Sequence, residues 1–221
     1  MFKVLILASL NNISDEKMEF YIRDCFSWLR FLGLKIGEPT PDRNTIWSFR
    51  ERLTRSNAIE ALFKQFDDYL KESGYVSTDG HIIDSTIVRA PRQRLCGDEK
   101  EAIKAGKSTH EIWPDNPNKA AQKDIDARWV IMTGKNHNKD KANPKLAIVT
   151  PQFGYKNHSC IDQNYGFIRS YEVSDACSHD SRHFISLLPQ IGAGQRVYAD
   201  TAYRSHKHEE WLKQHGFGYL Y

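Results

Sequence analysis

The spacing of apolar residues changes once along this chain, at Gly74, and this change limits the fold more than any other feature. Before Gly74, apolar residues recur every three or four positions, as on one face of a helix. The first regular segment after it, HIIDSTIV (81–88), is short and β-branched, which predicts a strand. Helices followed by alternating strands and helices predict a small all-α domain (1–75) and then an α/β domain (76–221).

The first domain is predicted to contain an opening helix and three capped helices. MFKVLILASL favours a core helix over a secretion signal, because acidic SDEKME follows it without a clear cleavage site. Ser14 caps the next helix, which Gly33 ends, and Asp42 caps the third. Asn57 and Glu60 form a capping box for the fourth. On the helix capped by Ser14, the residues expected to face inward are Met18, Ile22, Cys25, Leu29 and Leu32. On the helix after Asn57 they are Ile59, Leu62, Phe63, Phe66 and Leu70.

The second domain is predicted to alternate strands with short helices around a polar insertion at about 90–127. Gly and Pro interrupt this insertion, which is expected to be a long loop, and long loops in compact domains are usually functional or disordered. The segment 81–88 is apolar on both faces, as expected of a strand covered on both sides. The other expected elements are strands at 128–133, 145–150, 154–162, 167–174, 196–200 and 217–221, and helices at 179–190 and 206–215.

Charge is unevenly distributed along a nearly neutral chain. The net charge is +3, but residues 85–145 hold 13 Lys and Arg against 8 Asp and Glu. Such a local basic field attracts polyanions, although a solvated lysine-rich loop has the same composition. Four cysteines without a close pair fit a reducing cytoplasm, and no segment is long enough to span a bilayer.

Two aspartates carry the strongest chemical signal. Asp84 lies inside an apolar strand, sharing a face with Ile82, and Asp200 lies at the carboxyl end of another, where α/β sheets bind ligands. Together they would form an oxygen-only site suited to Mg²⁺ or Mn²⁺. Taken singly, Asp84 is more often paired with an arginine and Asp200 more often a cap or turn residue.

Histidines offer a weaker alternative. His179 with His183, and His206 with His208, have the spacing of zinc half-sites, but no Cys or Glu completes either set. Helix-surface histidines are the better interpretation, although the HDS triplet (179–181) can shape a site. No phosphate-binding glycine loop or nucleophile elbow is present in the sequence.

An ordered set of motifs resembles the DDE transposases of bacterial insertion sequences, in particular the insertion-sequence-five group. The motifs are IIDSTIVRAP, KDIDARWVIMTGKN, GYKNHSCID, GFIRSYEVSDACSHDS and VYADTAYRS, preceded by helical segments similar to that group's N-terminal domain. The resemblance covers nearly the whole chain, and the order of the motifs is more specific than any one of them.

This resemblance implies a ribonuclease H-like mixed sheet with flanking helices and a catalytic, metal-binding pair, Asp84 and Asp200. The family's third acidic residue is a Glu on a helix well beyond the second Asp. Glu209 and Glu210 follow Asp200 too closely to match it, and Thr201-Ala202 replaces the usual Lys-Gly. The expectation is therefore a transposase fragment, truncated at both ends, with little or no strand-transfer activity.

The resemblance also implies double-stranded DNA, both element ends and target, as partner, with Mg²⁺ or Mn²⁺ as cofactor. The other expected partners are a second copy or an intact transposase, and the expected location is the bacterial cytoplasm, at the nucleoid. Two alternatives stay open: an inactive DNA-binding or inhibitory module, and a divalent-metal nuclease unrelated to transposition. Candidate DNA contacts are Lys156, Lys123, Arg128, Lys135, Arg50, Arg52 and Arg55, each of which could equally be a solvated surface charge.

Overall fold

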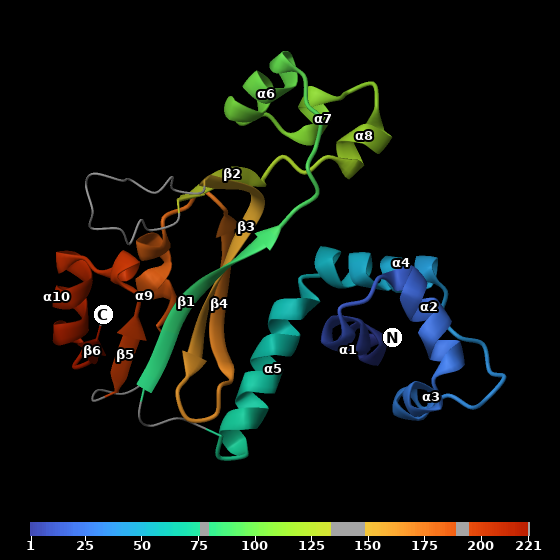
Figure 1. Cartoon of the computed structure of the whole chain (residues 1–221), viewed down its shortest axis with the longest axis horizontal. Coiled ribbons are helices and arrows are strands. Elements are labelled where there is room, and N and C mark those ends of the chain that lie inside the picture. Colours follow the sequence, from blue (N-terminus) through green and yellow to red (C-terminus); the bar gives the residue numbers. More distant parts are fainter. Residues whose placement is uncertain (76–79, 134–148, 189–194, 221) are drawn as a thin grey trace, which may run out of the picture. The chain divides into compact units, whose positions relative to one another are not determined.

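The computed structural model describes residues 1–75, 80–133, 149–188 and 195–220 (Figure 1). The chain divides into two compact units, Met1–Gly74 and Tyr75–Tyr221, and each is described by itself. Within the described ranges, no helix has the length and apolar character needed to cross a membrane.

The first unit is helical, with a core built by its first four helices. The helices are α1 (Phe2–Asn11), α2 (Asp15–Asp24), α3 (Phe26–Leu32), α4 (Arg43–Arg55) and α5 (Ala58–Glu72). The buried cluster consists of Val4, Leu7, Ala8, Met18, Ile22, Leu29 and Ile46. The predicted caps of α2 and α4 are confirmed: Ser14 Oγ accepts from Lys17 N at 3.4 Å, and Asp42 Oδ1 accepts from Thr45 N at 2.7 Å.

Some local predictions for this unit are wrong. The helix expected from Ser14 to Gly33 is broken at Cys25, whose backbone is extended (φ −102°, ψ 107°), and the break separates α2 from α3. Asn57 has a left-handed backbone (φ 49°) and makes no side-chain cap, so the expected capping box does not form. Ile59 and Phe66 were expected to face inward but are 43% and 52% exposed, because the core lies among α1–α4.

The second unit is built on a mixed sheet with β1 near its centre. Its described strands are β1 (Gly80–Arg89), β2 (Arg128–Thr133), β3 (Val149–Asp162), β4 (Ile168–Asp175), β5 (Arg196–Ala199) and β6 (Gly218–Leu220). β3 pairs with β1 antiparallel, and both β2 and β4 pair with β3. On the other side of β1, β5 and then β6 run parallel to it. The predicted mixed sheet with flanking helices is confirmed.

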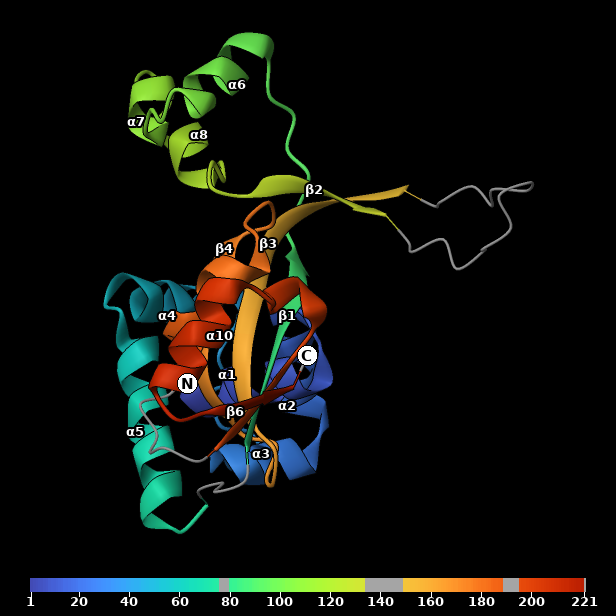
Figure 2. The ribbon, with the colours of Figure 1, turned by 90° about the vertical axis from the view of Figure 1, so that its left-hand side faces the viewer.

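One face of this sheet carries the core. Figures 1 and 2 show α9 (Phe184–Leu187) and α10 (His206–Gln214) on the same side of the strands. The buried cluster on that side is Ile83, Cys160, Phe184, Leu187, Leu188, Val197, Tyr203, Leu212 and Phe217. On the opposite face of β1, Ile82 and Val88 are 41% and 50% exposed. The expectation that 81–88 is covered on both sides is therefore wrong for the described structure.

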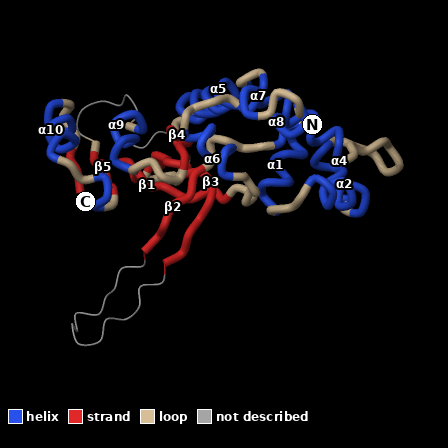
Figure 3. The backbone as a smooth tube through the Cα atoms, turned by 90° about the horizontal axis from the view of Figure 1, so that it is seen from above, coloured by secondary structure: helices blue, strands red, loops and turns tan. Residues whose placement is uncertain are grey.

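β2 and the first part of β3 form a two-stranded arm that runs away from the rest of the sheet (Figure 3). Strands 145–150 and 154–162 were expected to be separate, but one strand runs through Pro151, and residues 145–148 lie outside the described ranges. Pro151 is opposite Ile131 of β2, in a stretch of β3 that β1 does not reach. Proline is tolerated there because a strand with one neighbour has a free edge.

The insertion after β1 is helical rather than the expected loop. It contains α6 (Gly97–Lys104), α7 (Thr109–Ile112) and α8 (Pro117–Gln122). Glu99 links these helices: its carboxylate accepts from Lys119 Nζ at 2.6 Å, Trp113 Nε1 at 2.7 Å and Cys96 N at 2.9 Å. The hydrogen bonds from Lys119 and then from Trp113 and Cys96 lower the pKa of Glu99 to about 2. Hydrogen bonds between side chains of separate helices thus hold together an insertion whose sequence lacks a regular spacing of apolar residues.

Candidate active site

The pairing of β1 with β5 brings Asp84 and Asp200 to one place. In this parallel pair Ile82 lies opposite Tyr198 and Ile83 opposite Ala199, so the same register continued by one residue sets Asp84 beside Asp200. Neighbouring strands lie about 4.8 Å apart, and residues in register point to the same face. The two carboxylates are therefore expected to lie near one another where β5 ends.

Both aspartates are exposed, and each accepts a hydrogen bond from the residue that follows it. Asp84 Oδ1 accepts from the backbone N of Ser85 at 2.7 Å, and Asp200 Oδ1 accepts from Thr201 Oγ1 at 2.9 Å. Asp200 is the N-cap residue of η2 (Thr201–Tyr203), but its side chain makes no capping hydrogen bond. The expected alternative roles, a helix cap for Asp200 and an arginine pair for Asp84, are not seen in the described contacts.

A buried tyrosine lies among three carboxylates at this place. Tyr203 is 1% exposed, and burial raises its pKa to about 12. The negative charges of Asp180, Asp84 and Asp200 contribute to this rise, whereas the hydrogen bond with the Ser85 hydroxyl opposes it. The phenol therefore stays neutral, and Asp180 joins the two predicted aspartates as a nearby negative charge.

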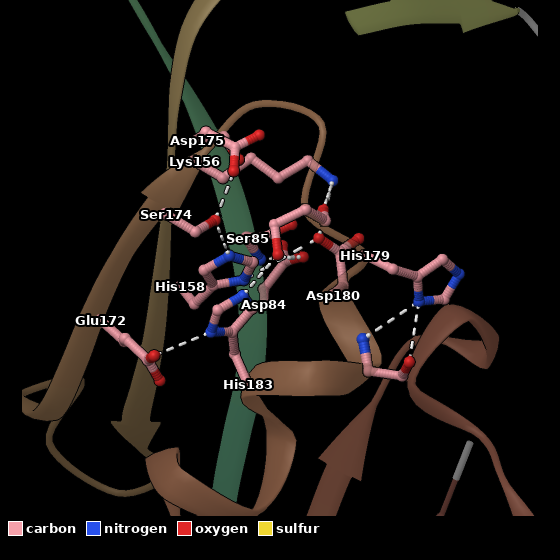
Figure 4. A network of polar contacts seen from close by, with 12 residues as sticks. Asp84, Ser85, Lys156, His158, Glu172, Ser174, Asp175, His179, Asp180 and His183 are labelled. Atoms are coloured by element: carbon pink, nitrogen blue, oxygen red, sulfur yellow. Dashed lines mark hydrogen bonds and ion pairs between the residues drawn. The ribbon is translucent and has the colours of Figure 1, made fainter. Parts of the chain in front are cut away.

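Asp180 is held by a lysine that was expected to contact DNA. Lys156 Nζ donates to Asp180 Oδ1 at 2.9 Å and to the carbonyl of Ser178 at 2.9 Å, and its side chain is only 15% exposed (Figure 4). The register sets Lys156 opposite Ile87, on the core side of the sheet. Because its charge is already balanced there, this position disfavours the predicted phosphate contact.

Two stacked histidines continue the network away from Asp180. The rings of His158 and His183 lie 4.2 Å apart, His158 Nε2 is 2.9 Å from Ser174 Oγ, and His183 Nδ1 is 2.9 Å from Glu172 Oε1 (Figure 4). His158 is fully buried beside Ser85, whose backbone N–H bonds Asp84. The network thus supports, from the core side, the strand that presents Asp84 on the other face.

Sequence reasoning missed most of this supporting network. His183 was expected on a helix surface, as was His208, yet His208 is 7% exposed, stacks on Phe184 at 4.8 Å and lies 2.8 Å from the Tyr203 carbonyl. Lys156 and His158 are two residues apart, a spacing that puts both on one strand face. That alternation was the available signal, but it does not reveal the partner Asp180.

Lowering the pH below 6.5 should destabilise the fold partly through His158. Burial, and then the neighbouring His183, lowers the pKa of His158 from its usual value near 6.5, while Asp180 acts in the opposite direction. The folded protein therefore binds this proton less readily than the unfolded chain does. The contribution of neutral His158 to the free energy of unfolding is fully present above pH 6.5 and is lost as the pH falls toward the lowered pKa. The loss is about 1.4 kcal/mol for each unit by which the folded and unfolded pKa values differ.

Urea unfolding at several pH values measures this effect. His158→Gln should flatten the loss of stability between pH 6.5 and 5, although buried His81, whose pKa burial also lowers, leaves a residual slope. His206→Gln, which changes a side chain that is 85% exposed, serves as control and should leave the slope unchanged. An unaltered slope in His158→Gln would contradict this assignment.

The other predicted DNA contacts are distributed over both units. Arg50 forms a two-pronged ion pair with Asp15, with N–O distances of 2.8 and 2.6 Å, and these hydrogen bonds raise the pKa of Arg50. Arg52 lies over the Phe49 ring at 6.0 Å, and Arg55 is 3.8 Å from Glu51. All three arginines are exposed on α4, and Arg50 is the most fully neutralised.

The remaining three predicted contacts belong to the basic middle segment. Lys123 Nζ donates to the carbonyl of Arg94 at 3.1 Å, and Arg128 Nη1 donates to the carbonyls of Ile125 and Ala127 at 2.5 and 3.1 Å. Among the residues that the structure describes, no carboxylate forms an ion pair with either cation. Lys135 lies outside the described residues.

The pair Asp84 and Asp200 fits a hard divalent cation, because it offers exposed carboxylate oxygens from adjacent strand positions. Among the described residues, no set of three His, Cys, Asp or Glu side chains is placed to hold a metal ion. A pair of carboxylates is a sparse ligand set, which predicts weak metal binding.

Comparison with known proteins points to one class. A family described as "Transposase DDE domain" matches residues 77–221, and one described as "Transposase domain (DUF772)" matches residues 1–52. Similar solved structures include the Mos1 strand transfer complex (TM-score 0.24, 15% identity, 99% of this chain and 75% of that chain). A pre-cleavage Mos1 transpososome is another (TM-score 0.26, 14% identity, 99% and 76%). Structural similarity this low supports no inference about the site.

Proposed function

Because the chain belongs to the DDE transposase family, whose domain matches residues 77–221, we propose that Asp84 and Asp200 are its catalytic, metal-binding carboxylates. The observation that supports this proposal is the register of β1 and β5, which, continued by one residue, would make the two side chains neighbours. The substrate is double-stranded DNA, which is cleaved at one strand of the element end. The new 3′-hydroxyl then attacks target DNA.

The two aspartates would hold Mg²⁺ or Mn²⁺, which when bound stabilises charge on the attacking and leaving oxygens of a phosphodiester. The chain's own contribution would be to place two negative charges on neighbouring segments of the sheet. Tyr203 and the network of Lys156, Asp180 and His158 support these strands from the core side. Cytoplasmic, nucleoid-associated DNA is the expected place of action, and a second copy or an intact transposase is the expected protein partner.

Metal binding is the first test, because it does not depend on cleavage. Mn²⁺ binding followed by water-proton relaxation should be weak, with a dissociation constant of about 10⁻⁴–10⁻³ M. Asp84→Asn and Asp200→Asn should each reduce it at least tenfold. Asp115→Asn changes an exposed aspartate in the insertion and should leave it unchanged. Equal Mn²⁺ binding in all variants would contradict the assignment.

The sign of the stability change separates a functional pair from a structural one. Like charges directly opposite on neighbouring strands cost about 0.2–1 kcal/mol. Without metal, Asp84→Asn and Asp200→Asn should therefore raise the free energy of unfolding slightly, whereas removal of a structural hydrogen-bond acceptor would lower it.

DNA cleavage distinguishes the remaining functions. With duplexes that carry the element ends, any cleavage should require Mg²⁺ or Mn²⁺ and be abolished by Asp200→Asn. Cleavage without preference for those ends would favour a nuclease, and DNA binding without cleavage a binding or inhibitory module. Cleavage that survives Asp200→Asn would overturn the proposal.

A further inference from the structure

The insertion forms an open, basic hollow whose lining includes neither Asp84 nor Asp200. The hollow has a volume of about 660 Å³ and lies between the segment 91–94 and the region around α8. Its cationic lining residues are Arg92, Arg94, Lys119 and Lys123, and none of its lining residues is acidic. The rest of the lining is mostly amide side chains, from Gln93, Asn116, Asn118 and Gln122.

Three of these four cations keep their full charge for a ligand. Lys119 is neutralised by Glu99 at 2.6 Å, but among the described residues no carboxylate forms an ion pair with Arg92, Arg94 or Lys123. Both arginines are exposed. An isolated cluster of unpaired cations is unfavourable by itself, so a bound anion would stabilise it.

The hollow is held in shape by hydrogen bonds across it. Lys123 Nζ donates to the Arg94 carbonyl at 3.1 Å, and Asp124 N donates to Gln93 Oε1 at 3.2 Å. These bonds tie the segment leaving β1 to the segment entering β2. These hydrogen bonds fix the backbone that carries the cations, so less conformational entropy is lost when an anion binds.

A second, smaller hollow continues the basic surface toward the sheet. It has a volume of about 160 Å³, is lined by Arg89 and Arg92, and shares Arg92 with the larger hollow. Arg92 lies over the Trp129 ring at 5.2 Å, and Arg89 Nε donates to Gln152 Oε1 at 2.9 Å. Arg89, Arg92, Arg94 and Lys123 thus form one track, called here the insertion track.

The spacing of the insertion track fits a phosphate backbone better than a single anion. From Arg89 to Arg94 the chain can span at most about 18 Å. One DNA strand advances about 3.4 Å per phosphate along the helix axis, so this segment can reach along at most about five nucleotides. Cations that line two adjoining hollows can meet successive phosphates of one strand, whereas a single free phosphate would occupy one hollow.

We propose that the insertion track binds the sugar–phosphate backbone of double-stranded DNA, and this inference rests on the proposed function for its choice of nucleic acid. Duplex is favoured over single strand because single-strand sites provide exposed rings for base stacking. The aromatic side chains at the track are Trp129, over whose ring Arg92 lies, and half-buried Phe153, which packs against Trp129 at 5.4 Å. Amide and guanidinium groups beside unpaired cations are the groups with which proteins contact the sugar–phosphate backbone of DNA.

The test is binding of the full chain to a short fluorescent duplex, followed by anisotropy at several salt concentrations. The double variant Arg92→Gln/Arg94→Gln should weaken binding roughly tenfold and reduce the salt slope by about 2, irrespective of duplex sequence. The matched control Lys100→Gln/Lys107→Gln removes two exposed charges from the same insertion outside the hollow. It should change affinity less than about twofold.

Protection of arginines in the unaltered protein provides a second measurement that does not depend on a variant folding. Phenylglyoxal should modify Arg92 and Arg94 in the free chain, and duplex should protect both. Arg196, exposed at the start of β5, should stay reactive in either state. Protection by single-stranded DNA or free phosphate but not by duplex would overturn the choice of ligand.

The failures of the two proposals can be told apart. If Mn²⁺ binding depends on Asp84 and Asp200 but Arg92→Gln/Arg94→Gln binds duplex as tightly as the unaltered chain, only the insertion track is overturned. If duplex protects Arg92 and Arg94 while the aspartate variants bind Mn²⁺ normally, only the proposed function fails. A chain that binds no duplex overturns the insertion track and removes the substrate from the proposed function.

Discussion

Replacing Arg169 by methionine should lower the free energy of unfolding by about 3–5 kcal/mol, because it leaves a buried carboxylate without its cation. Asp162 Oδ2 accepts from Arg169 Nε at 3.1 Å and lies 3.0 Å from Nη2, and the two side chains are 0% and 4% exposed. Arg169 also donates to the carbonyl of Tyr75. The pair therefore joins the end of β3 and the start of β4 to the first residue of the unit.

Urea unfolding followed by circular dichroism measures this effect, and two further variants identify its cause. Adding Asp162→Leu to Arg169→Met should recover much of the stability, since removing both charges removes the uncompensated one. Recovery will be incomplete because Asp162 Oδ1 also accepts from Tyr165 N at 2.6 Å. Arg204→Met, which breaks an ion pair 65% exposed on the arginine side, should cost less than about 1 kcal/mol. Equal losses in Arg169→Met and Arg204→Met would contradict the argument.

Replacing Gly154 by alanine should cost roughly 3 kcal/mol or more, because both the backbone and the available space exclude a side chain. Gly154 has φ +152°, and a Cβ there would lie 2.1 Å from the Val88 carbonyl oxygen and 2.8 Å from Ala90 N. Backbone atoms of a paired strand cannot move aside as a side chain can. Gly154 pairs with both Arg89 and Arg128, so the strain falls where the insertion leaves and re-enters the sheet.

Gly97→Ala provides a control of opposite sign. Gly97 is the first residue of α6, its φ is not in the left-handed range, and no atom lies within 4 Å of a Cβ built there. Alanine should therefore stabilise α6 by up to about 1 kcal/mol. Thermal unfolding of both variants measures the contrast, and a Gly154→Ala protein as stable as the unaltered chain would show that β1 and β3 can separate here without cost.

The two parts of the site differ in how far sequence could predict them. Asp84 and Asp200 were identifiable singly, because each is a carboxylate at an unusual place in a strand pattern. Their proximity depends on a parallel register between strands far apart in the chain, which no local period encodes. Asp180 was outside the prediction for the same reason, since its partners Lys156 and His158 come from β3.

Local chemistry predicted most elements and failed where tertiary contacts compete with it. The caps at Ser14 and Asp42 were predicted, because a hydroxyl or carboxylate meets a backbone N–H three residues later. The break at Cys25 could not be predicted, since an unbroken apolar period runs through it. The insertion was read as a loop because its helices depend on Glu99, whose partners lie in separate turns.

By itself, the sequence predicted a helical part followed by a mixed α/β part and the location of most strands, and it singled out the two aspartates as candidates, because these depend on period, composition and short-range hydrogen bonds. The tertiary structure alone decided which face of β1 is buried, which residues surround Tyr203, and that Lys156 neutralises Asp180. It also decided that Arg92, Arg94 and Lys123 line one hollow. The physical reason is that strand register and long-range ion pairs join segments whose order in the chain says nothing about their distance in space.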